Sequence, residues 1–452
     1  MSIWSKPYRP YGRAFVAMLM VLLSMPRMGG AHAQASADVL TRSTVTAEER
    51  MLSLASLWSE ARFSFAYYDN VAASWDSLYQ AFIPRIRAAA SDYEYYLELM
   101  RFFAHLRDGH SGIFWPPAFD EALGYPPLEI RKIQGRAVIF RILRDADELT
   151  RNEIRPGLAI IRIDGKPVED QVAYWRALKT GSTEQATDRL AYFRILTGRR
   201  NTQVEVVVEE PGGATRMVRL SRSEKYFNDT NLQPPRLYSS REPESGIGYF
   251  QANQMTDSVG EAFGRYIETA GALKGLVLDL RYNGGGSDLV SYKLVSRLID
   301  EPLDGQIYEV LSYRPDHPAY RREQETIRTR GSKIAPAVGK RFTGQLVVLI
   351  GEQTHSAAEG GFLSVVRNRP HTVFIGEPTA GSTGQPMGFP LPGGALGVVC
   401  SVRTLAPDGR PFVGVGFHPD VKVSLSQDDL FRRRDGVLDR SIEELKRGQR
   451  DR

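Results

Sequence analysis

A serine and a cluster of glycines, each placed after a short apolar run, are the residues of this 452-residue sequence best suited to chemistry. Ser356 follows the apolar residues 346–350, and the glycine-rich turn 283–286 follows the apolar residues 276–280. A serine ahead of an amphipathic run can lie at a helix N-terminus, where unpaired N–H groups and the helix dipole stabilise an oxyanion. Glycines allow backbone N–H groups to approach a ligand closely. The two motifs together predict acyl transfer with Ser356 as the nucleophile.

The elements expected to hold these residues are the strands and helices of an α/β fold. The runs 276–280 and 346–350 are typical of buried parallel strands, and each leads through a turn into an amphipathic, helix-like run. Open α/β sheets bind ligands at the carboxyl ends of their strands, which is where both turns fall. Either motif alone is equally compatible with a structural role, as a serine N-cap or a glycine-rich loop. Their combination favours a shared site.

Three motifs resemble those of a known family. They are Asp279-Leu-Arg281-Tyr-Asn283-Gly-Gly-Gly286, Thr354-His-Ser356-Ala-Ala-Glu359 and Gly376-Glu-Pro-Thr379-Ala-Gly381. The chain is similar, with gaps from about residue 48 to about residue 425, to the serine peptidases that include the C-terminal-processing (tail-specific) proteases and the tricorn core. The resemblance implies an α/β fold with a crotonase/Clp-protease-like βαβ core, an N-terminal helical domain and a small β-rich PDZ-like domain.

The family activates its serine in two ways, and the chain resembles one branch more than the other. The tail-specific branch uses a lysine in Thr-x-Gly-Lys-Gly, whereas this chain has Ser382 at the lysine position, so the Ser/Lys dyad is absent. The tricorn-like branch uses a serine and a histidine, supported by a further serine and a glutamate. Its histidine lies in a segment similar to residues 106–112, which implies that His110 is the general base. At the position of the glutamate the chain has Val413 or a neighbour, and no acid.

The resemblance also implies supporting residues around the nucleophile. The oxyanion hole would consist of the N–H of Ala357 and one N–H from Gly284 or Gly285. The acid that orients His110 stays open among several carboxylates, and Glu359 is expected to be structural rather than catalytic. The candidate acids and other supporting residues are Asp108, Glu377, Asp408, Ser111, Glu359 and Ser382. No histidine spacing indicates a metal site, and no cofactor is expected.

The N-terminus has the pattern of a secretory signal peptide. A basic start precedes the apolar residues 15–25, and Ala31-His32-Ala33 is a cleavage signal, so residues 1–33 are expected to be removed on export to the periplasm or the medium. An uncleaved anchor is the alternative. The segment holds four basic residues and no acid (Lys6, Arg9, Arg13, Arg27), so its removal lowers the net charge from +5 to +1. A nucleic-acid partner is therefore not inferred.

The rest of the chain divides into four expected regions. They are an N-terminal helical domain (46–116), a PDZ-like domain (120–225), a catalytic α/β core (244–425) and a charged C-terminal tail (426–452). The expected function is that of a secreted or periplasmic serine peptidase, with no membrane span after signal cleavage. Its partner is a protein or peptide substrate, which a PDZ-like domain could bind by its C-terminus. The alternative is a non-catalytic ligand- or peptide-binding protein on the same fold.

Overall fold

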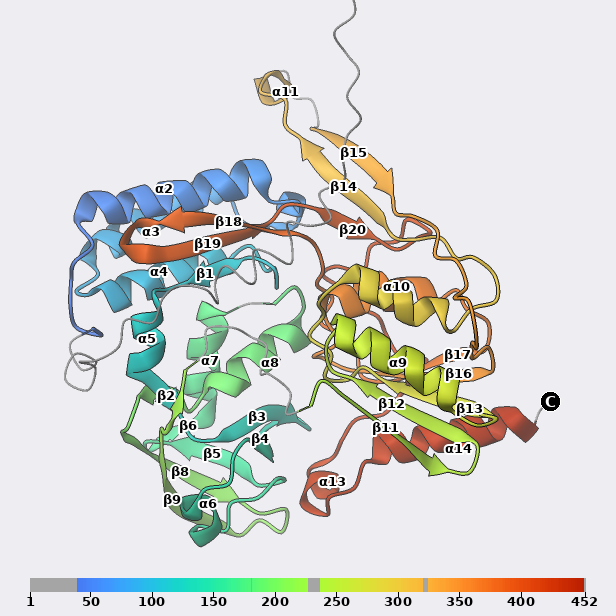
Figure 1. Ribbon diagram of the computed structural model, residues 1–452. Helices are drawn as coiled ribbons and strands as arrows, with labels where there is room; N and C mark the ends of the chain where they lie inside the picture. Colours follow the sequence, from blue (N-terminus) through green and yellow to red (C-terminus); the bar gives the residue numbers. More distant parts are fainter. Residues whose placement is uncertain (1–38, 180, 227–235, 320–323, 451–452) are drawn as a thin grey trace, which may run out of the picture.

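The computed structural model describes residues 39–179, 181–226, 236–319 and 324–450. The predicted signal segment lies outside these residues. Figure 1 shows a helical part and a β-rich part on one side, and an α/β part on the other, which agrees with the expected α/β fold class. In the ranges that the structure describes, no helix is both long and apolar enough to cross a membrane.

The α/β part is built on a sheet of six strands in the order β11-β12-β13-β16-β17-β21. The strands from β12 to β21 pair in parallel, and β11 is an antiparallel edge strand. The predicted strands 276–280 and 346–350 correspond to neighbouring strands β13 and β16. The bounds are β11 (Tyr238–Glu244), β12 (Ile247–Ala252), β13 (Gly275–Asp279), β16 (Gln345–Ile350), β17 (Thr372–Gly376) and β21 (Val421–Lys422).

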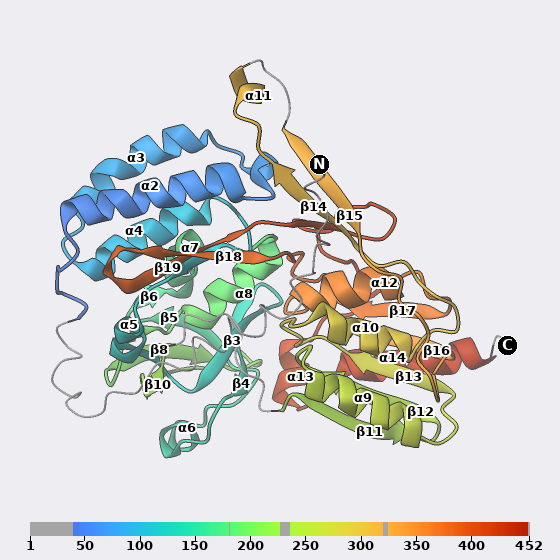
Figure 2. The same ribbon diagram turned by 45° about the horizontal axis from the view of Figure 1, so that its top comes forward.

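Helices cover both faces of this sheet (Figures 1 and 2). Because side chains alternate along a strand, Leu276 and Leu278 pack under α9 (Asp257–Thr269) and α10 (Asp288–Ser296), while Val277 faces α14 (Gly436–Arg450). A short helix, α13 (Gln427–Phe431), precedes α14. Four apolar residues of α14 are buried on the sheet, namely Val437, Leu438, Ile442 and Leu445. The charged tail expected from the sequence is thus one layer of the core.

The helical part precedes the site in the chain. Thr46 and Glu49 form a capping box at the start of α2 (Ala47–Ser64). The other elements are α3 (Trp75–Ala88), α4 (Asp92–Ala104), β1 (Gly112–Phe114) and α5 (Pro117–Ala122). Aromatic side chains such as Tyr95 and Phe102 are buried in its core.

The β-rich part has a sheet in the order β3-β4-β5-β8-β9, with β6 paired to β5. It also contains helices that the sequence did not predict, and the likeness to a PDZ domain stays a prediction. The strands are β2 (Leu123–Tyr125), β3 (Leu128–Ile133), β4 (Arg136–Ile142), β5 (Ala159–Ile163), β6 (Lys166–Pro167), β7 (Gly198–Arg199), β8 (Gln203–Glu209), β9 (Thr215–Ser221) and β10 (Glu224–Lys225). The helices are α6 (Asp147–Arg151), α7 (Val168–Leu178) and α8 (Glu184–Arg194).

Two hairpins leave the α/β part. The first, β18 (Pro386–Leu391) with β19 (Ala395–Cys400), crosses to the helical part, where β19 pairs with β1. The second joins β14 (Ile307–Ser312) through α11 (Asp316–Ala319) to β15 (Glu325–Arg330), and β14 also pairs with β20 (Arg403–Leu405). Figures 1 and 2 show this hairpin projecting from the body.

Candidate active site

Ser356 lies in a strained turn at the carboxyl end of β16. Its backbone φ is +59°, in the left-handed region that side chains other than glycine rarely adopt. Two hydrogen bonds hold the turn: the His355 N–H donates to the Asn283 carbonyl at 3.0 Å, and the Ser356 N–H donates to the Ser382 carbonyl at 2.8 Å. The strain therefore persists because neighbouring loops fix the backbone on both sides.

The predicted helix after Ser356 is present, but it is not a regular α-helix. A 3-10 turn (Ser356–Ala358) leads into a π-helical turn (Glu359–Leu363) and then into α12 (Ser364–Val366). Such π turns are rare and occur frequently at functional sites. The Ala357 N–H lies in the first turn, where N–H groups have no partner within the helix. Ser356 therefore stands where backbone donors are available.

His110 reaches Ser356 from the far end of the sequence. Its Nε2 lies 3.0 Å from Ser356 Oγ and its Nδ1 lies 2.8 Å from Ser382 Oγ. The segment that carries it leads into β1, which pairs with β19, and the β18–β19 hairpin begins a few residues after Ser382. This hairpin thus joins the histidine segment to the loop that contacts it. The structure brings together the two residues that the sequence nominated as nucleophile and base.

Asp108 holds the histidine segment without contacting the imidazole. Its Oδ2 accepts hydrogen bonds from Ser111 Oγ at 2.6 Å and from the His110 backbone N–H at 3.2 Å. The Ser111 hydroxyl also accepts from the Cys400 N–H at 3.0 Å. Burial raises the pKa of Asp108 and lowers the pKa of His110, and the Asp108 charge partly offsets the shift at His110. The imidazole is therefore neutral near neutral pH.

His355 stacks on His110, with ring centroids 4.6 Å apart and planes 11° apart. Burial, followed by the nearby His110, holds the pKa of His355 well below its usual range. A neutral His355 adds no charge beside His110. His355 therefore packs on the face of the His110 ring.

Glu359 anchors the loop that presents Ser382. Its carboxylate is fully buried and accepts hydrogen bonds from Thr379 Oγ1, from the Gly381 N–H at 2.7 Å and from the Ser382 N–H at 2.8 Å. It has no side-chain hydrogen bond to Ser356 Oγ or to the His110 ring in the described part of the chain. Glu359 thus acts on the base through Ser382, without a direct contact with the His110 ring.

Burial raises the pKa of Glu359 from 4.5 to about 8, which gives a testable pH dependence of stability. The folded chain holds this proton more tightly than the unfolded chain does. Its contribution to stability is complete below the usual pKa and is lost as the pH rises through about 8. Glu359→Gln has no such proton. From about pH 5 to about pH 9, the wild type should lose about 4 kcal/mol more unfolding free energy than this variant. Urea denaturation at both pH values measures the difference; parallel losses would contradict it. Glu443→Gln, on an exposed part of α14, is the control.

The remaining candidate acids lie elsewhere. Glu377 accepts a hydrogen bond from Ser424 Oγ at 2.7 Å, and Asp408 pairs with Arg410 at 2.7 Å. The side-chain group in contact with His110 Nδ1 is the Ser382 hydroxyl, at the position where the tail-specific branch has its lysine. The sequence could name Ser382 as a supporting residue. It could not rank Ser382 above the carboxylates, because the ring orientation depends on contacts far apart in the chain.

The glycine-rich turn lies against the nucleophile. A Cβ added to Gly285, whose φ is +92°, would fall 2.5 Å from Ser356 Cβ. The Gly285 N–H donates to Asn283 Oδ1 at 2.9 Å, whereas the Gly284 N–H has a longer contact of 3.3 Å with the Asn253 carbonyl. Gly285 is thus beside Ser356, and the N–H of Gly284, the residue before it, is held less firmly.

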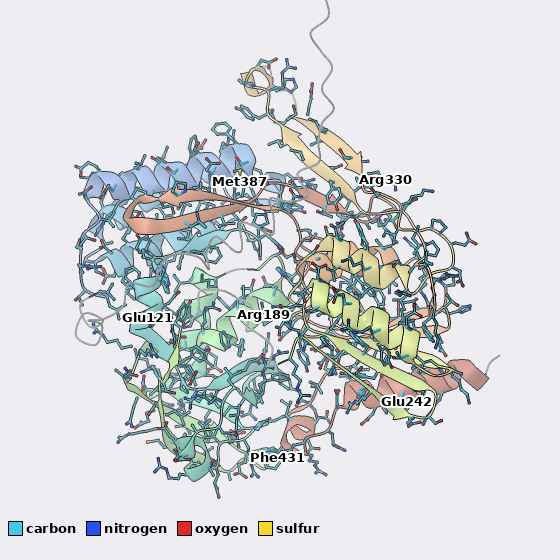
Figure 3. The ribbon with its side chains drawn as sticks, in the orientation of Figure 1. Glu121, Arg189, Glu242, Arg330, Met387 and Phe431 are labelled. Carbon is cyan, nitrogen blue, oxygen red and sulfur yellow. The ribbon has the colours of Figure 1, made fainter. Side chains whose placement is uncertain are left out.

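The start of helix α8 and the two residues before it contact both active-site loops, which the sequence did not predict. Ser182 Oγ accepts from the Gly109 N–H at 3.0 Å and lies 3.3 Å from Asp108 Oδ1. Thr183 Oγ1 and Gln185 Nε2 donate to the carbonyls of the loop before Ser382, at Ala380 (2.9 Å) and Thr379 (2.8 Å). The Ser-Thr pair could signal a helix start, but not this docking. Figure 3 shows Arg189 of α8 at the same junction between the two parts.

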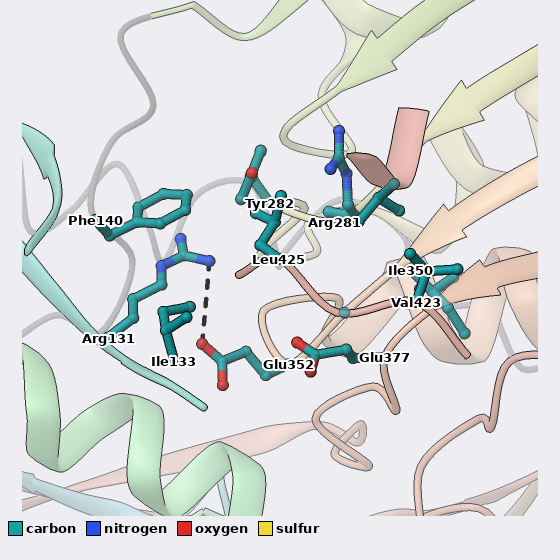
Figure 4. A pocket seen from close by; sticks show the side chains of 13 residues that line it. Arg131, Ile133, Phe140, Arg281, Tyr282, Ile350, Glu352, Glu377, Val423 and Leu425 are labelled. Atoms are coloured by element: carbon teal, nitrogen blue, oxygen red, sulfur yellow. Dashed lines mark ion pairs between the residues drawn. The ribbon is translucent and has the colours of Figure 1, made fainter. Parts of the chain in front are cut away.

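A small cavity lies beneath the loop that leads to Ser356 (Figure 4). The Arg131 guanidinium lies 3.8 Å from the Phe140 ring centroid, 4.0 Å from Glu352 Oε1 and 2.9 Å from Gln353 Oε1. The cavity volume of about 40 Å³ suits a few water molecules rather than a peptide. It is therefore too small to be a peptide site. Among the described residues, no group of acidic, histidine and cysteine side chains is placed to hold a metal ion.

Comparisons with known proteins agree on the fold. Residues 246–423 match the model of peptidase family S41. The chain is similar to the solved structure of mature CPAF complexed with lactacystin, at 16% identity and a TM-score of 0.70, covering 89% of this chain and 98% of that one. A putative peptidase from Parabacteroides merdae is 16% identical with a TM-score of 0.52, covering 89% and 97%. No match was found among curated proteins.

Proposed function

The chain carries a serine-type peptidase domain of family S41, and we propose that it is an exported peptidase with Ser356 as nucleophile and His110 as general base. The observation that carries the proposal is the 3.0 Å contact between His110 Nε2 and Ser356 Oγ. The proposal assigns the chain to the Ser/His branch, because Ser382 stands where the other branch has its lysine. The export signal, the division into domains and binding of substrate C-termini by the PDZ-like part remain part of this proposal.

The proposed reaction proceeds through an acyl-enzyme. His110 carries its own proton on Nδ1, which donates to Ser382 Oγ, so that the Nε2 lone pair faces the Ser356 hydroxyl. Nε2 takes the serine proton as Oγ attacks the substrate carbonyl, and the imidazolium then gives that proton to the leaving amine. A water molecule repeats the two steps on the ester. It releases the acid and restores the free serine.

The developing oxyanion needs donors close to Ser356. The Ala357 N–H supplies one, as the first turn of the helix leaves it free of an intrahelical partner. We assign the other to Gly284 rather than Gly285, because the Gly285 N–H already donates to Asn283 Oδ1 at 2.9 Å. Each donor is worth about 3–4 kcal/mol of transition-state stabilisation in comparable sites.

Ser382 is proposed as a positioning residue. Ser382→Ala should lower kcat/KM about tenfold, since it removes one neutral hydrogen bond to the base. It should also shift the acid limb of the pH–rate profile to lower pH, because the imidazolium loses an acceptor. The measurement is a pH profile of ester hydrolysis for the variant and for Ser401→Ala, a control serine whose hydroxyl donates to the Gln385 carbonyl instead. An unshifted limb would contradict a positioning role.

A non-catalytic peptide-binding protein is the second candidate. The observation that favours it is the hydroxyl on His110 Nδ1, because a carboxylate is the usual partner of a catalytic imidazole. Incubation of an unstructured peptide with the wild type and with Ser356→Ala separates the candidates. If the protein is a peptidase, the wild type should release fragments and Ser356→Ala should not. A binding protein retains the peptide intact in both forms.

A further inference from the structure

A half-buried carboxylate without a cationic partner lies beside the helical segment that begins at Ser356 (residues 356–366, here the nucleophile helix). Asp288, the first residue of α10, accepts at Oδ2 from Gln306 Nε2 at 2.7 Å, with Tyr308 Oη at 3.4 Å. No lysine or arginine pairs with it in the part of the chain that the structure describes. Burial raises the pKa of Asp288 to about 6, so the group remains ionised near neutral pH. A half-buried negative charge of this kind calls for a positive partner.

The position of Asp288 is fixed by contacts with the nucleophile helix on both sides of it in sequence. Before it, Gly285 lies against Ser356. After it, Ser291 Oγ donates to the Ala357 carbonyl at 2.8 Å. The carboxylate itself touches the same helix, since Oδ1 lies 2.7 Å from the position that a Cβ on Gly361 would take. Asp288 therefore lies against the helix that begins at Ser356.

A second polar group next to Asp288 also lacks a donor. Gln306 is 1% exposed, and its Oε1 has no hydrogen-bond partner among the described residues. The orientation of this amide follows from its neighbour, since Nε2 must be the atom that faces the Asp288 carboxylate. Oε1 lies 2.5 Å from the position of a Cβ on Gly360. Two acceptors, one charged and one neutral, thus lie against adjacent glycines of the nucleophile helix.

We propose that Asp288 and Gln306 bind the basic side chain of the substrate residue whose carbonyl Ser356 attacks, a lysine or an arginine. This inference rests on the proposed function. That residue is the part of a substrate anchored at Ser356, so its side chain is the closest to the nucleophile helix. An ammonium group has three N–H donors, which suit the Asp288 carboxylate and Gln306 Oε1. Leu289, next to Asp288 and 65% exposed, offers apolar surface for the methylene stem.

The test compares peptides that differ only at the residue before the scissile bond, with lysine, norleucine or glutamate there. For the wild type, kcat/KM for lysine should exceed that for norleucine, its neutral analogue, about tenfold, and glutamate should be the poorest. Asp288→Asn should bring the lysine-to-norleucine ratio close to one. Asp257→Asn is the matched control and should keep the wild-type ratio, because Asp257 is exposed and already pairs with Lys293.

The outcomes separate this inference from the proposed function. Norleucine and lysine peptides cleaved equally by the wild type would overturn the basic-residue site and leave the peptidase proposal standing. A ratio unchanged in Asp288→Asn would overturn it as well. If Asp288→Asn does not fold, Gln306→Glu decides: a second charge should raise the ratio, and an unchanged ratio would overturn the inference. Failure to cleave any peptide would overturn the proposed function and this site with it.

Discussion

Replacing His110 with alanine is expected to lower kcat by roughly 10⁴- to 10⁶-fold while the fold persists. The serine hydroxyl is a weak nucleophile at neutral pH, and Nε2 of His110 is the group placed to take its proton, at 3.0 Å. Without the ring, only oxyanion stabilisation and substrate binding remain. Steady-state hydrolysis of an activated ester measures the loss, and circular dichroism checks the fold.

The matched control for this variant is His418→Ala, since His418 is exposed and lies in a loop. It should retain wild-type turnover. The wild type should also lose activity as the pH falls, because protonated His110 cannot accept the serine proton. Burial lowers the pKa of His110, so this acid limb should lie below the usual histidine value of about 6.5. Near-full turnover in His110→Ala with Ser356 still essential would mean that another group is the base.

Gly285→Ala is expected to lower kcat/KM by at least about 100-fold. The new Cβ would lie 2.5 Å from Ser356 Cβ and 2.9 Å from the His355 carbonyl, so the nucleophile or the glycine-rich turn must move. A displacement of about 1 Å in an active site can cost this much, because the attack geometry and the oxyanion donors both depend on it. Labelling of Ser356 by a fluorophosphonate and turnover of substrate should fall together.

A second glycine separates this clash from backbone strain. Gly213, in the turn between β8 and β9, has a φ of +86°, close to the +92° of Gly285, and a Cβ there would meet nothing within 4 Å. Gly213→Ala therefore carries a similar strain without touching the site, and it should keep wild-type turnover. Equal losses of activity in the two variants would indicate destabilisation of the fold rather than displacement of Ser356.

The parts of the site that could be predicted are those whose residues lie close together both in the sequence and in the fold. The strand–turn–helix motifs around 276–286 and 346–359 are local, so their apolar runs and glycines predict neighbouring parallel strands whose loops meet. The assignment of His110 came from family resemblance, since nothing in the residues around it indicates that a hairpin carries it to Ser356. Local pattern therefore predicted the nucleophile but not its partner.

The remaining parts depend on contacts between distant segments. Ser382 meets the His110 ring across 272 residues of sequence, and no periodicity encodes such a contact. Likewise α8 lies in a segment interpreted as β-rich, yet Ser182 and Thr183 ahead of it hold the two active-site loops. The helix of the charged tail is amphipathic, and its few apolar residues are spaced for burial on the sheet, which its charged composition did not indicate. Tertiary packing, rather than local sequence, determines all three of these contacts.

The most direct measurement is the reaction of the folded protein with a fluorophosphonate, followed by peptide mass spectrometry to locate the adduct. A serine activated by an imidazole at 3.0 Å should form a single adduct, at Ser356, and His110→Ala should abolish it. A folded protein that gives no adduct at Ser356, while a known serine hydrolase in the same tube is fully labelled, would contradict the assignment of Ser356 as an activated nucleophile.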